Sequence, residues 1–277
     1  MRIKDIVKIL TDSGIEENEA NIEVKLMLEY CANYTLADII TGEKLSDEKL
    51  KIVEEKAKLR ANTRKPIQYI IGLADFMGEK FIVNQSVLIP RDETEFLVRQ
   101  AIKIIKQEKY TNVMDMCTGT GCIACIIAKH TQASVLGVDI STEALHLAIK
   151  NMENLGLYNR ATFRKSNLFE KIRKDEKFDI IVSNPPYIAP KYRQNIQPEV
   201  TYEPDIALYT NDEEGLEFYK KISSEAPNYL KKGGYLMFEL GYGQSNDVSQ
   251  ILHDNGYKSI KVIKDLAKID RVIYAHV

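Results

Sequence analysis

The sequence has few cysteines, no long apolar run and almost no net charge, and each shortage excludes a class of protein. Four cysteines in 277 residues do not make a disulfide framework, and no Cys/His cluster has the spacing of a zinc site. The longest apolar stretch, Cys122 to Ala128, is far shorter than the roughly eighteen residues that a membrane span needs. Charges in the first five residues are unlike a signal peptide. We therefore expect a cytoplasmic protein that needs neither a membrane nor a metal.

The charge balance bears on nucleic-acid binding. Lys and Arg number 38 and Asp and Glu number 40, which gives a net charge of −2. No overall positive field is then available to hold a long nucleic acid by its phosphates, so any such contact would be local. The Lys-rich segment 165–177 is interpreted as a solvated surface. With 44% hydrophobic and 28% charged residues, the chain has the composition of a globular protein of one or two domains.

The pattern of apolar residues changes along the chain. Helical spacing over residues 16–30, and again from Ser46 onward, predicts that the first part is all helical. Between residues 66 and 90, short apolar pieces broken by glycine and asparagine indicate an extended linker or a hairpin. We predict a helical domain over residues 1–75, a linker or hairpin over 76–92, and a larger domain over 93–277.

The larger domain alternates strand and helix. Short β-rich apolar runs separated by stretches of helical period imply a mostly parallel sheet covered on both faces, so the fold class is α/β. Two further strand candidates close the sequence without a long helix between them, which favours an antiparallel last strand. The predicted strands span residues 113–116, 134–140, 178–183, 235–240, 258–263 and 271–276.

A glycine-rich loop, Asp115 to Gly121, joins the first of these strands to an apolar helix. Glycines let the backbone turn tightly and let a ligand approach the main chain at a helix N-terminus. Asp139 follows Gly119 by 20 residues, at the end of the second strand, where an acid binds ribose hydroxyls. This pattern fits both NAD and S-adenosylmethionine, and Asp115 favours the latter because a carboxylate would repel a pyrophosphate. The alternative is a tight turn with Asp139 at a helix N-terminus.

The strand over residues 178–183 runs directly into Asn184-Pro185-Pro186-Tyr187. Ligands of open parallel sheets sit at the carboxyl ends of strands, so this segment and the glycine loop can face one pocket. Two prolines remove two backbone donors, and the Asn184 side-chain oxygen with the Pro185 carbonyl can accept both hydrogens of a planar NH₂ on which Tyr187 stacks. The arrangement suits methylation of an amide or an exocyclic amine by positioning and electrostatics. A simple Pro-Pro turn is the alternative.

With these motifs, the sequence resembles the release factor glutamine methyltransferases, and the resemblance spans nearly the whole chain. It is carried by the glycine loop, by the Asn-Pro-Pro-Tyr tetrapeptide and by further motifs, of which the two at Pro66 to Gly72 and Leu88 to Glu95 are more restricted than that tetrapeptide. The further motifs are Pro66 to Gly72, Leu88 to Glu95, Glu203-Pro204 with Ala207-Leu208, Gly215-Leu216, Gly233-Gly234, Glu239-Leu240-Gly241 with Gln244, and Asp270-Arg271-Val272.

The resemblance implies an enzyme that uses S-adenosyl-L-methionine and releases S-adenosyl-L-homocysteine. Its acceptor would be the Gln of the Gly-Gly-Gln motif in bacterial-type peptide-chain release factors, with no nucleic acid required. It further implies a helical N-terminal domain that holds the release factor and a seven-stranded Rossmann-like catalytic domain. The implied cofactor-binding residues are Cys117, Thr118, Gly119, Thr120, Gly121, Asp139, Asn167, Leu168 and Asn184, and the implied catalytic residues are Asn184, Pro185, Pro186 and Tyr187.

The sequence departs from the family pattern at three places. Cys117 stands where the family usually has Gly, which is harmless if its φ is negative and strained if it is positive. Asn167 replaces the usual Asp, so it keeps an oxygen for an adenine amino group but loses a charge. Asp92 and Glu93 replace a Pro-Asp pair, which makes that turn less rigid.

Several other polar residues have competing interpretations. Cys122 and Cys125 form a C-x-x-C, which we interpret as small buried side chains of an apolar helix and not as a redox pair. Glu239 either lines the pocket near the sulfonium or is a capping or salt-bridged acid. Arg91 and Glu95 either fold over the cofactor or pair at the surface.

Two other functions stay open at this level. Methylation of an adenine amino group in DNA or RNA fits the same tetrapeptide, but it calls for a basic face or a target-recognition domain. A nicotinamide-dependent oxidoreductase, or a nucleotide-binding module without catalysis, fits the glycine loop but leaves residues 184–187 unexplained.

Overall fold

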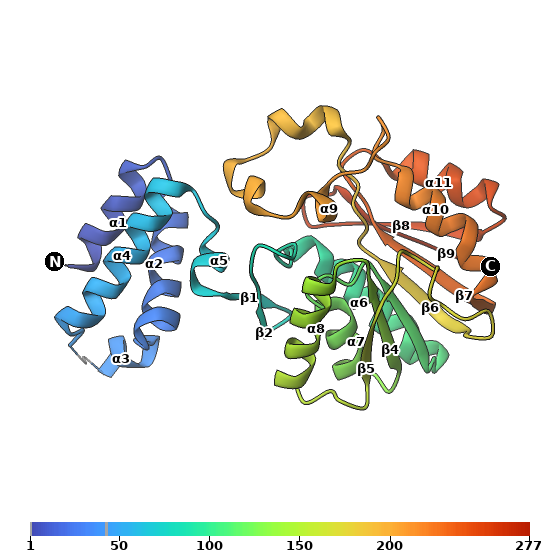
Figure 1. The fold of residues 1–277 in the computed structure, drawn as a ribbon, viewed down its shortest axis with the longest axis horizontal. Coiled ribbons are helices and arrows are strands. Elements are labelled where there is room, and N and C mark those ends of the chain that lie inside the picture. Colours follow the sequence, from blue (N-terminus) through green and yellow to red (C-terminus); the bar gives the residue numbers. More distant parts are fainter. Residues whose placement is uncertain (1, 42–43) are drawn as a thin grey trace. The chain divides into compact units, whose positions relative to one another are not determined.

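The computed structural model describes residues 2–41 and 44–277 (Figure 1). The chain forms two compact units, each described here by itself. One comprises Met1–Leu73 and Gln197–Tyr202, and the other comprises Ala74–Ile196 and Glu203–Val277. The boundaries that we expect for functional domains, near residues 75 and 92, stay a prediction.

The first unit is helical, as its periodicity predicts. Side chains cap two of the helices at their start: the Glu16 carboxylate accepts from the backbone of Asn18 and Glu19, and Ser46 Oγ accepts from Lys49 N. Apolar side chains on their inner faces form one core that includes Leu10 and Met27. The helices are α1 (Ile3–Asp12), α2 (Glu17–Ala32), α3 (Leu36–Thr41), α4 (Asp47–Thr63) and α5 (Ile67–Ile71).

A distant segment of the chain completes this unit. This segment, residues 197–202, contains a 3-10 helix, Pro198–Tyr202. The Glu199 carboxylate on this helix accepts from Arg60 Nη1 at 2.8 Å and lies 2.6 Å from Arg64 Nη2. The Arg60 side chain is 1% exposed, and its Nε also donates to the buried Glu23 at 3.0 Å. Tyr202 OH donates to Thr63 O at 2.6 Å. Residues 197–202 are thus held within the helical unit by the ion pairs of Glu199 with Arg60 and Arg64.

A hairpin of β1 (Leu73–Phe76) and β2 (Glu79–Ile82) begins three residues before the predicted start of the linker at residue 76. Met77 and Gly78, with φ of 52° and 81°, form its turn. Asn151 is fully buried, exchanges hydrogen bonds with the Ile82 backbone and donates to Thr120 O at 3.0 Å. One side chain therefore ties the hairpin to the glycine loop.

The second unit is built on a seven-stranded sheet with the order β5-β4-β3-β6-β7-β9-β8. The pairs β3–β4, β3–β6, β4–β5 and β6–β7 are parallel, and β9 runs antiparallel to both β7 and β8, as the sequence pattern predicts. The strands are β3 (Asn112–Met116), β4 (Ser134–Asp139), β5 (Ala161–Lys165), β6 (Phe178–Ser183), β7 (Leu230–Glu239), β8 (Lys258–Lys264) and β9 (Asp270–His276).

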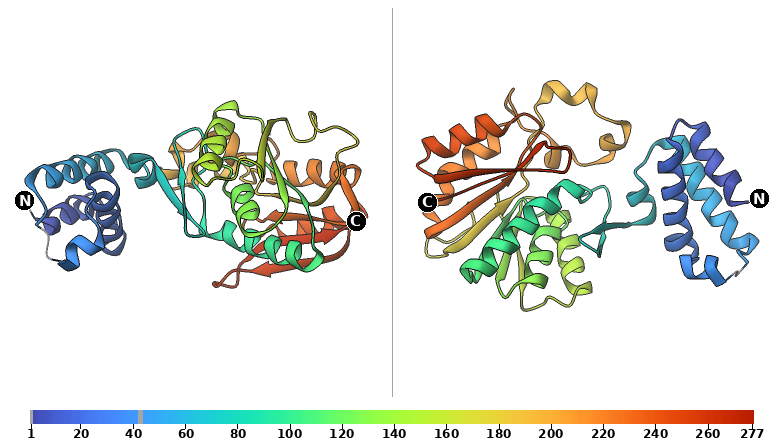
Figure 2. Two further views of the ribbon diagram at one scale, coloured as in Figure 1. Left: turned by 90° about the horizontal axis from the view of Figure 1, so that it is seen from below. Right: turned by 180° about the vertical axis from the view of Figure 1, so that it is seen from behind.

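Helices cover both faces of this sheet (Figures 1 and 2), which confirms the predicted α/β class. On one face, α6 and α7 pack on residues such as Val113 and Ile180, and on the other face α10 and α11 pack on Met114 and Ile181. Among the described residues, no helix combines the length and the apolarity that crossing a membrane requires. The helices are α6 (Asp92–Glu108), α7 (Cys122–His130), α8 (Thr142–Asn154), α9 (Asp205–Leu208), α10 (Glu217–Glu225) and α11 (Ser245–Asp254), with 3-10 turns at Pro190–Asn195 and Ala226–Asn228.

Candidate active site

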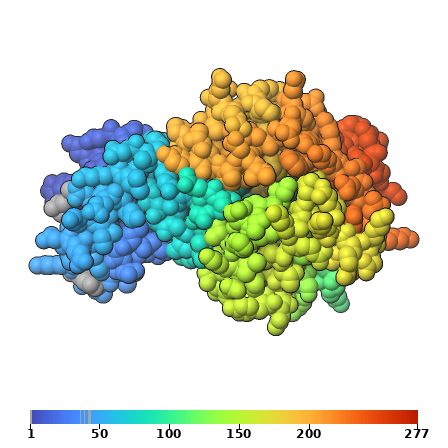
Figure 3. All heavy atoms as spheres, in the orientation of Figure 1, coloured from blue at the N-terminus to red at the C-terminus, as the bar shows by residue number. Residues whose placement is uncertain are grey.

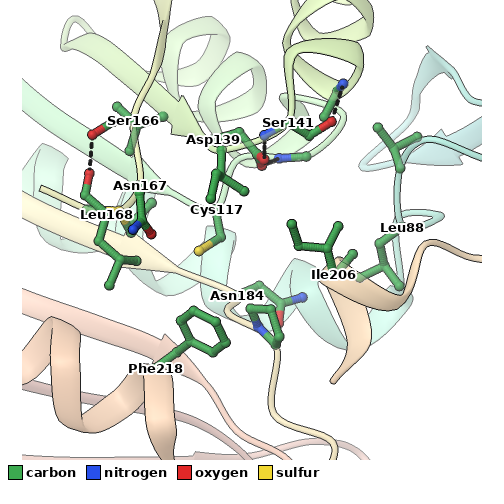
Figure 4. A pocket seen from close by; sticks show the side chains of 18 of the residues that line it. Leu88, Cys117, Asp139, Ser141, Ser166, Asn167, Leu168, Asn184, Ile206 and Phe218 are labelled. Carbon is green, nitrogen blue, oxygen red and sulfur yellow. Dashed lines mark hydrogen bonds between the residues drawn. The ribbon is translucent and has the colours of Figure 1, made fainter. Parts of the chain in front are cut away.

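A cavity of about 350 Å³ lies at the carboxyl ends of β3, β4 and β6. Its size is within the range of about 300–1,000 Å³ that small-ligand sites occupy. Cys117 and Gly119 follow β3, Asp139 ends β4, and Asn184 and Pro186 follow β6, and all five line it (Figure 4). In the space-filling view of Figure 3, its walls come from the green segment near residue 140 and from the orange segment near residues 206–221. The glycine loop and the Asn-Pro-Pro-Tyr segment thus face one cavity.

The glycine loop is held from beneath by Asp115. This fully buried carboxylate accepts through Oδ2 from Thr118 Oγ1 at 2.5 Å and from Ala124 N at 3.1 Å. Its Oδ1 has no hydrogen-bond partner among the described residues, and burial raises the pKa of Asp115 to about 7. Asp115 is not among the described residues that line the cavity. It orders the loop and does not receive a ligand directly.

The expected cofactor-loop residues divide into two groups. Cys117 and Gly119 line the cavity, whereas Thr118, Thr120 and Gly121 are buried behind it. Gly121 has φ of 77°, and a Cβ there would lie 2.9 Å from the Ala148 Cβ, so the close approach of loop to α8 requires glycine. The buried members therefore shape the loop.

Cys117 has φ of 62°, in the left-handed region that costs a non-glycine residue about 1–2 kcal/mol. The departure from glycine noted in the sequence therefore strains the loop. The sulfur points toward the cavity (Figure 4), and burial, with the nearby Asp139 carboxylate, raises the pKa of the thiol. A thiol kept protonated is a poor nucleophile, so Cys117 is a wall of the cavity and not a reactive group.

Asp139 holds the glycine loop and the start of α8, and it also lines the cavity. Its Oδ1 accepts from Ser141 N, at the start of α8, and its Oδ2 accepts from Gly119 N, each at 2.9 Å. Burial raises the pKa of Asp139, and the backbone donors oppose that rise. Each carboxylate oxygen has a further lone pair, so Asp139 can still accept hydroxyl groups of a ligand from the cavity.

Asn167 and Leu168, which follow β5, also line the cavity. Asn167 Nδ2 donates to Glu170 Oε1 at 2.7 Å, which leaves the side-chain oxygen to accept from an amino group. Leu168 has φ of 47°, and its carbonyl accepts from Ser166 Oγ at 2.6 Å. Ser166 thus holds the turn that presents both residues.

The Asn-Pro-Pro-Tyr segment meets the cavity through Asn184 and Pro186. Pro185 is buried and Tyr187 is half-buried, and neither is among the described residues that line it. Asn184 Nδ2 donates to Thr94 Oγ1 at 3.2 Å, and Tyr187 OH donates to Glu239 Oε1 at 3.4 Å. Burial and the Glu239 charge raise the pKa of Tyr187, so its hydroxyl stays protonated.

Glu239 is a structural acid, as in the second of the two interpretations, but hydrogen bonds from Thr94 and Tyr187 take the place of the expected cap or salt bridge. It is 2% exposed and does not line the cavity among the described residues, and burial raises its pKa to about 7. Arg91 and Glu95 also engage other protein groups: Arg91 Nη2 donates to the buried Glu203 at 2.7 Å, and Glu95 accepts from Met77 N.

Several site residues escape sequence reasoning. Leu88 and Thr94 belong to a recognised motif, but nothing in the sequence assigns them a role. Ile206 and Phe218 line the cavity within or just after recognised motifs that assign neither residue a role (Figure 4). Their flat and aliphatic surfaces make the cavity suitable for an aromatic ring.

The chain is similar to known methyltransferases. A family model described as a methyltransferase domain matches residues 107–269. A release factor glutamine methyltransferase of Fusobacterium nucleatum is 44% identical over 236 residues, which cover 84% of this chain and 66% of that protein. One of Clostridium acetobutylicum is 37% identical over 281 residues, which cover 99% of this chain and 98% of that protein.

Among solved structures, a methyltransferase from Pyrococcus furiosus superimposes with a TM-score of 0.54 at 19% identity. The alignment covers 84% of this chain and 98% of that chain. At this identity, the likeness shows the fold alone.

Proposed function

Because the chain belongs to the release factor glutamine methyltransferase family, we propose that it methylates the side-chain amide nitrogen of the Gln in the Gly-Gly-Gln motif of peptide-chain release factors. The proposal is supported by one arrangement above all. Asn184, which follows β6, lines the same cavity as Gly119 and Asp139. A nucleoside and an acceptor amide could therefore meet there.

The residues present fit S-adenosylmethionine. Asp139 can accept from ribose hydroxyls, the Asn167 side-chain oxygen can accept from an adenine amino group, and Ile206 and Phe218 can flank the ring. When bound, the cofactor supplies an electrophilic methyl group on a positively charged sulfur. The cofactor-binding set proposed from the sequence thus stays Cys117, Thr118, Gly119, Thr120, Gly121, Asp139, Asn167, Leu168 and Asn184, with Thr118, Thr120 and Gly121 acting through the shape of the loop.

The acceptor side needs no strong base. Asn184 Oδ1 and the Pro185 carbonyl would accept the two amide hydrogens, which favours the pyramidal, positively charged nitrogen that forms as the methyl group arrives. Pro186 fixes the backbone, and Tyr187, which lies beside the described lining of the cavity, would stack on an acceptor that reaches past Pro186 and orient its plane. One N–H proton is then lost to water, and the product is a neutral secondary amide. Orientation and electrostatics carry the rate.

The decisive experiment uses radiolabelled S-adenosylmethionine, the purified enzyme, and a release factor that is either intact or has the motif Gln changed to Ala. We expect label in the intact factor and none in the variant, and no label in DNA or RNA supplied in its place. Asn184→Ala should lose transfer by on the order of a hundredfold, as for removal of a preorganised polar contact, and weaken cofactor binding by much less. Equal labelling of both release factors would contradict the proposal.

A further inference from the structure

A buried chain of hydrogen bonds leads away from Asn184. Asn184 Nδ2 donates to Thr94 Oγ1 at 3.2 Å, and Thr94 Oγ1 donates to Glu239 Oε2 at 2.5 Å. Tyr187 OH donates to the other carboxylate oxygen of Glu239. Thr94 lies in the first turn of α6 and is 3% exposed, and Glu239 ends β7 and is 2% exposed. Groups from three elements thus meet behind the cavity, where water does not compete.

The direction of this chain follows from the number of protons. A threonine hydroxyl has one hydrogen, and an ionised carboxylate only accepts. The Thr94 hydrogen therefore goes to Glu239, and the Thr94 oxygen is left as an acceptor. Asn184 must then turn its NH₂ end toward Thr94, which leaves its oxygen for the cavity. The reversed amide would set two acceptors against each other, at a cost that corresponds to roughly a ten- to hundredfold preference.

We infer that Thr94 and Glu239 are positioning residues, which hold the Asn184 amide with its oxygen toward the acceptor. The inference rests on the proposed role of Asn184 and goes beyond it, because neither Thr94 nor Glu239 lines the cavity among the described residues. We call the hydrogen-bonded chain of Asn184, Thr94 and Glu239 the relay. It gives a reason for the buried carboxylate at the end of β7, because Glu239 stabilises one of the two orientations of the Asn184 amide.

The same geometry predicts a dependence on pH. Burial raises the pKa of Glu239 to about 7, the charge of Glu93 on α6 adds to the rise, and the bonds from Thr94 and Tyr187 and the charge of Arg271 on β9 oppose it. Once protonated, Glu239 can donate to Thr94 Oγ1. The Thr94 hydrogen is then free for the Asn184 oxygen, and the amide can reverse. Transfer should therefore rise as pH increases through about 7.

Three variants test the relay through the kinetics of methyl transfer. Thr94→Val keeps the shape without the hydroxyl, Thr94→Ser restores the hydroxyl, and Glu239→Gln removes the obligatory acceptor. For Thr94→Val and Glu239→Gln we expect kcat to fall by roughly ten- to hundredfold, with the KM for the cofactor unchanged, as for a lost preorganised contact. Thr94→Ser should stay within about threefold of the wild type.

Two further signatures separate positioning from mere stability. First, the fall in kcat below pH 7 should vanish in Thr94→Val and in Glu239→Gln. Second, the double variant Thr94→Val/Glu239→Gln should be no slower than the slower of the two single variants, because the two residues act in series. Thr131→Val is the matched control: it removes another buried threonine hydroxyl, which donates to Ile127 O on α7, and it should keep the pH profile. Additive losses in the double variant, or an unchanged kcat in Thr94→Val, would overturn the inference.

An activity-independent measurement distinguishes failure of the relay from failure of the proposed function. In protein labelled with ¹⁵N-asparagine, the Asn184 side-chain NH₂ signals are identified by their absence in Asn184→Asp. We expect them to shift and to exchange faster with solvent in Thr94→Val than in the wild type. If they are unchanged, the relay is wrong even where the wild type methylates a release factor. If they change but no release factor is labelled, the relay stands and the proposed substrate is wrong.

Discussion

Gln244 holds the Tyr187 carbonyl from the N-terminus of α11. Its Nε2 donates to Tyr187 O at 3.1 Å, and its Oε1 accepts from Gly241 N at 3.1 Å. Gly215 lies against the same carbonyl, because a Cβ there would be 2.2 Å from Tyr187 O. Tyr187 is therefore fixed at both ends, by Gln244 at its carbonyl and by Glu239 at its hydroxyl. The Asn-Pro-Pro-Tyr segment owes its rigidity to these contacts as well as to its two prolines.

Removing the Gln244 contact should loosen this segment without unfolding the sheet. For Gln244→Ala we expect kcat for methyl transfer to fall by on the order of tenfold or more, because small misplacements of a positioning segment are costly. Cofactor affinity, measured by titration calorimetry with S-adenosylhomocysteine, should stay within about threefold of the wild type. Gln250→Ala is the control, since Gln250 lies on the same helix and donates to the exposed Asp254. Equal activity of the two variants would contradict this role.

The main frame of the fold is readable from the sequence because buried parallel strands are continuous apolar runs. The strand predicted at residues 178–183 coincides with β6, all of whose residues are buried. The edge strand β5 carries no such signal: Ala161–Lys165 is short and ends in the half-buried Arg164 and the exposed Lys165. Its pairing with β4 comes from the tertiary structure, so the sequence pattern misses it.

The candidate site is readable only in part, for a related reason. Motif positions place Asp139 and Asn184 at strand ends, and both line the cavity. Which loop side chains turn inward is decided by packing, so Asp115 and Thr118 are buried although their spacing suits ligand contact. The contact of Arg60 with Glu199 joins residues 139 positions apart, and no local pattern reports it.

The strain at Cys117 predicts opposite effects for two substitutions. Cys117→Gly should keep or raise the free energy of unfolding, by up to about 1 kcal/mol, because glycine adopts the left-handed conformation without a Cβ clash. Cys117→Val should lower it by about 1–2 kcal/mol or more, because a β-branched residue is a genuine outlier there. Urea unfolding measures both. Cys31→Gly, in the last turn of helix α2, is the control and should destabilise by up to about 1 kcal/mol. A valine variant as stable as the wild type would refute the strain.

The buried charges around Arg60 predict a specific pattern of stability losses. Arg60→Met leaves the buried Glu23 carboxylate without its partner, and should destabilise the helical unit by about 3–5 kcal/mol. The double variant Arg60→Met/Glu23→Leu should recover part of that loss, since it removes the uncompensated charge. Arg99→Ala breaks the exposed pair with Glu95 and should cost at most about 1 kcal/mol. The measurement is urea unfolding followed by far-UV circular dichroism, and a double variant less stable than Arg60→Met would contradict the assignment.

Asp115 predicts how stability depends on pH. The folded protein keeps the Asp115 proton up to pH about 7, whereas the unfolded chain loses it near pH 3.8. Between these two pH values the unfolded chain binds fewer protons than the folded protein does. A rise in pH therefore shifts the folding equilibrium toward the unfolded chain. This contribution to folding is complete below pH 3.8 and is lost as pH rises through about 7, and its full size corresponds to ~4 kcal/mol.

Urea unfolding at pH 5 and pH 8 measures this contribution of Asp115. In Asp115→Asn, the loss of stability between these two pH values should be smaller than in the wild type by ~2–3 kcal/mol, because the amide does not titrate. Asn at this position also changes the free energy of unfolding at every pH, because Asp115 Oδ1 has no hydrogen-bond partner among the described residues. The change in that free energy between pH 5 and pH 8 isolates the titration. Asp175→Asn, at an exposed ion pair with Arg173, should leave the pH dependence as it is in the wild type. The same loss in Asp115→Asn as in the wild type would show that another group carries the titration.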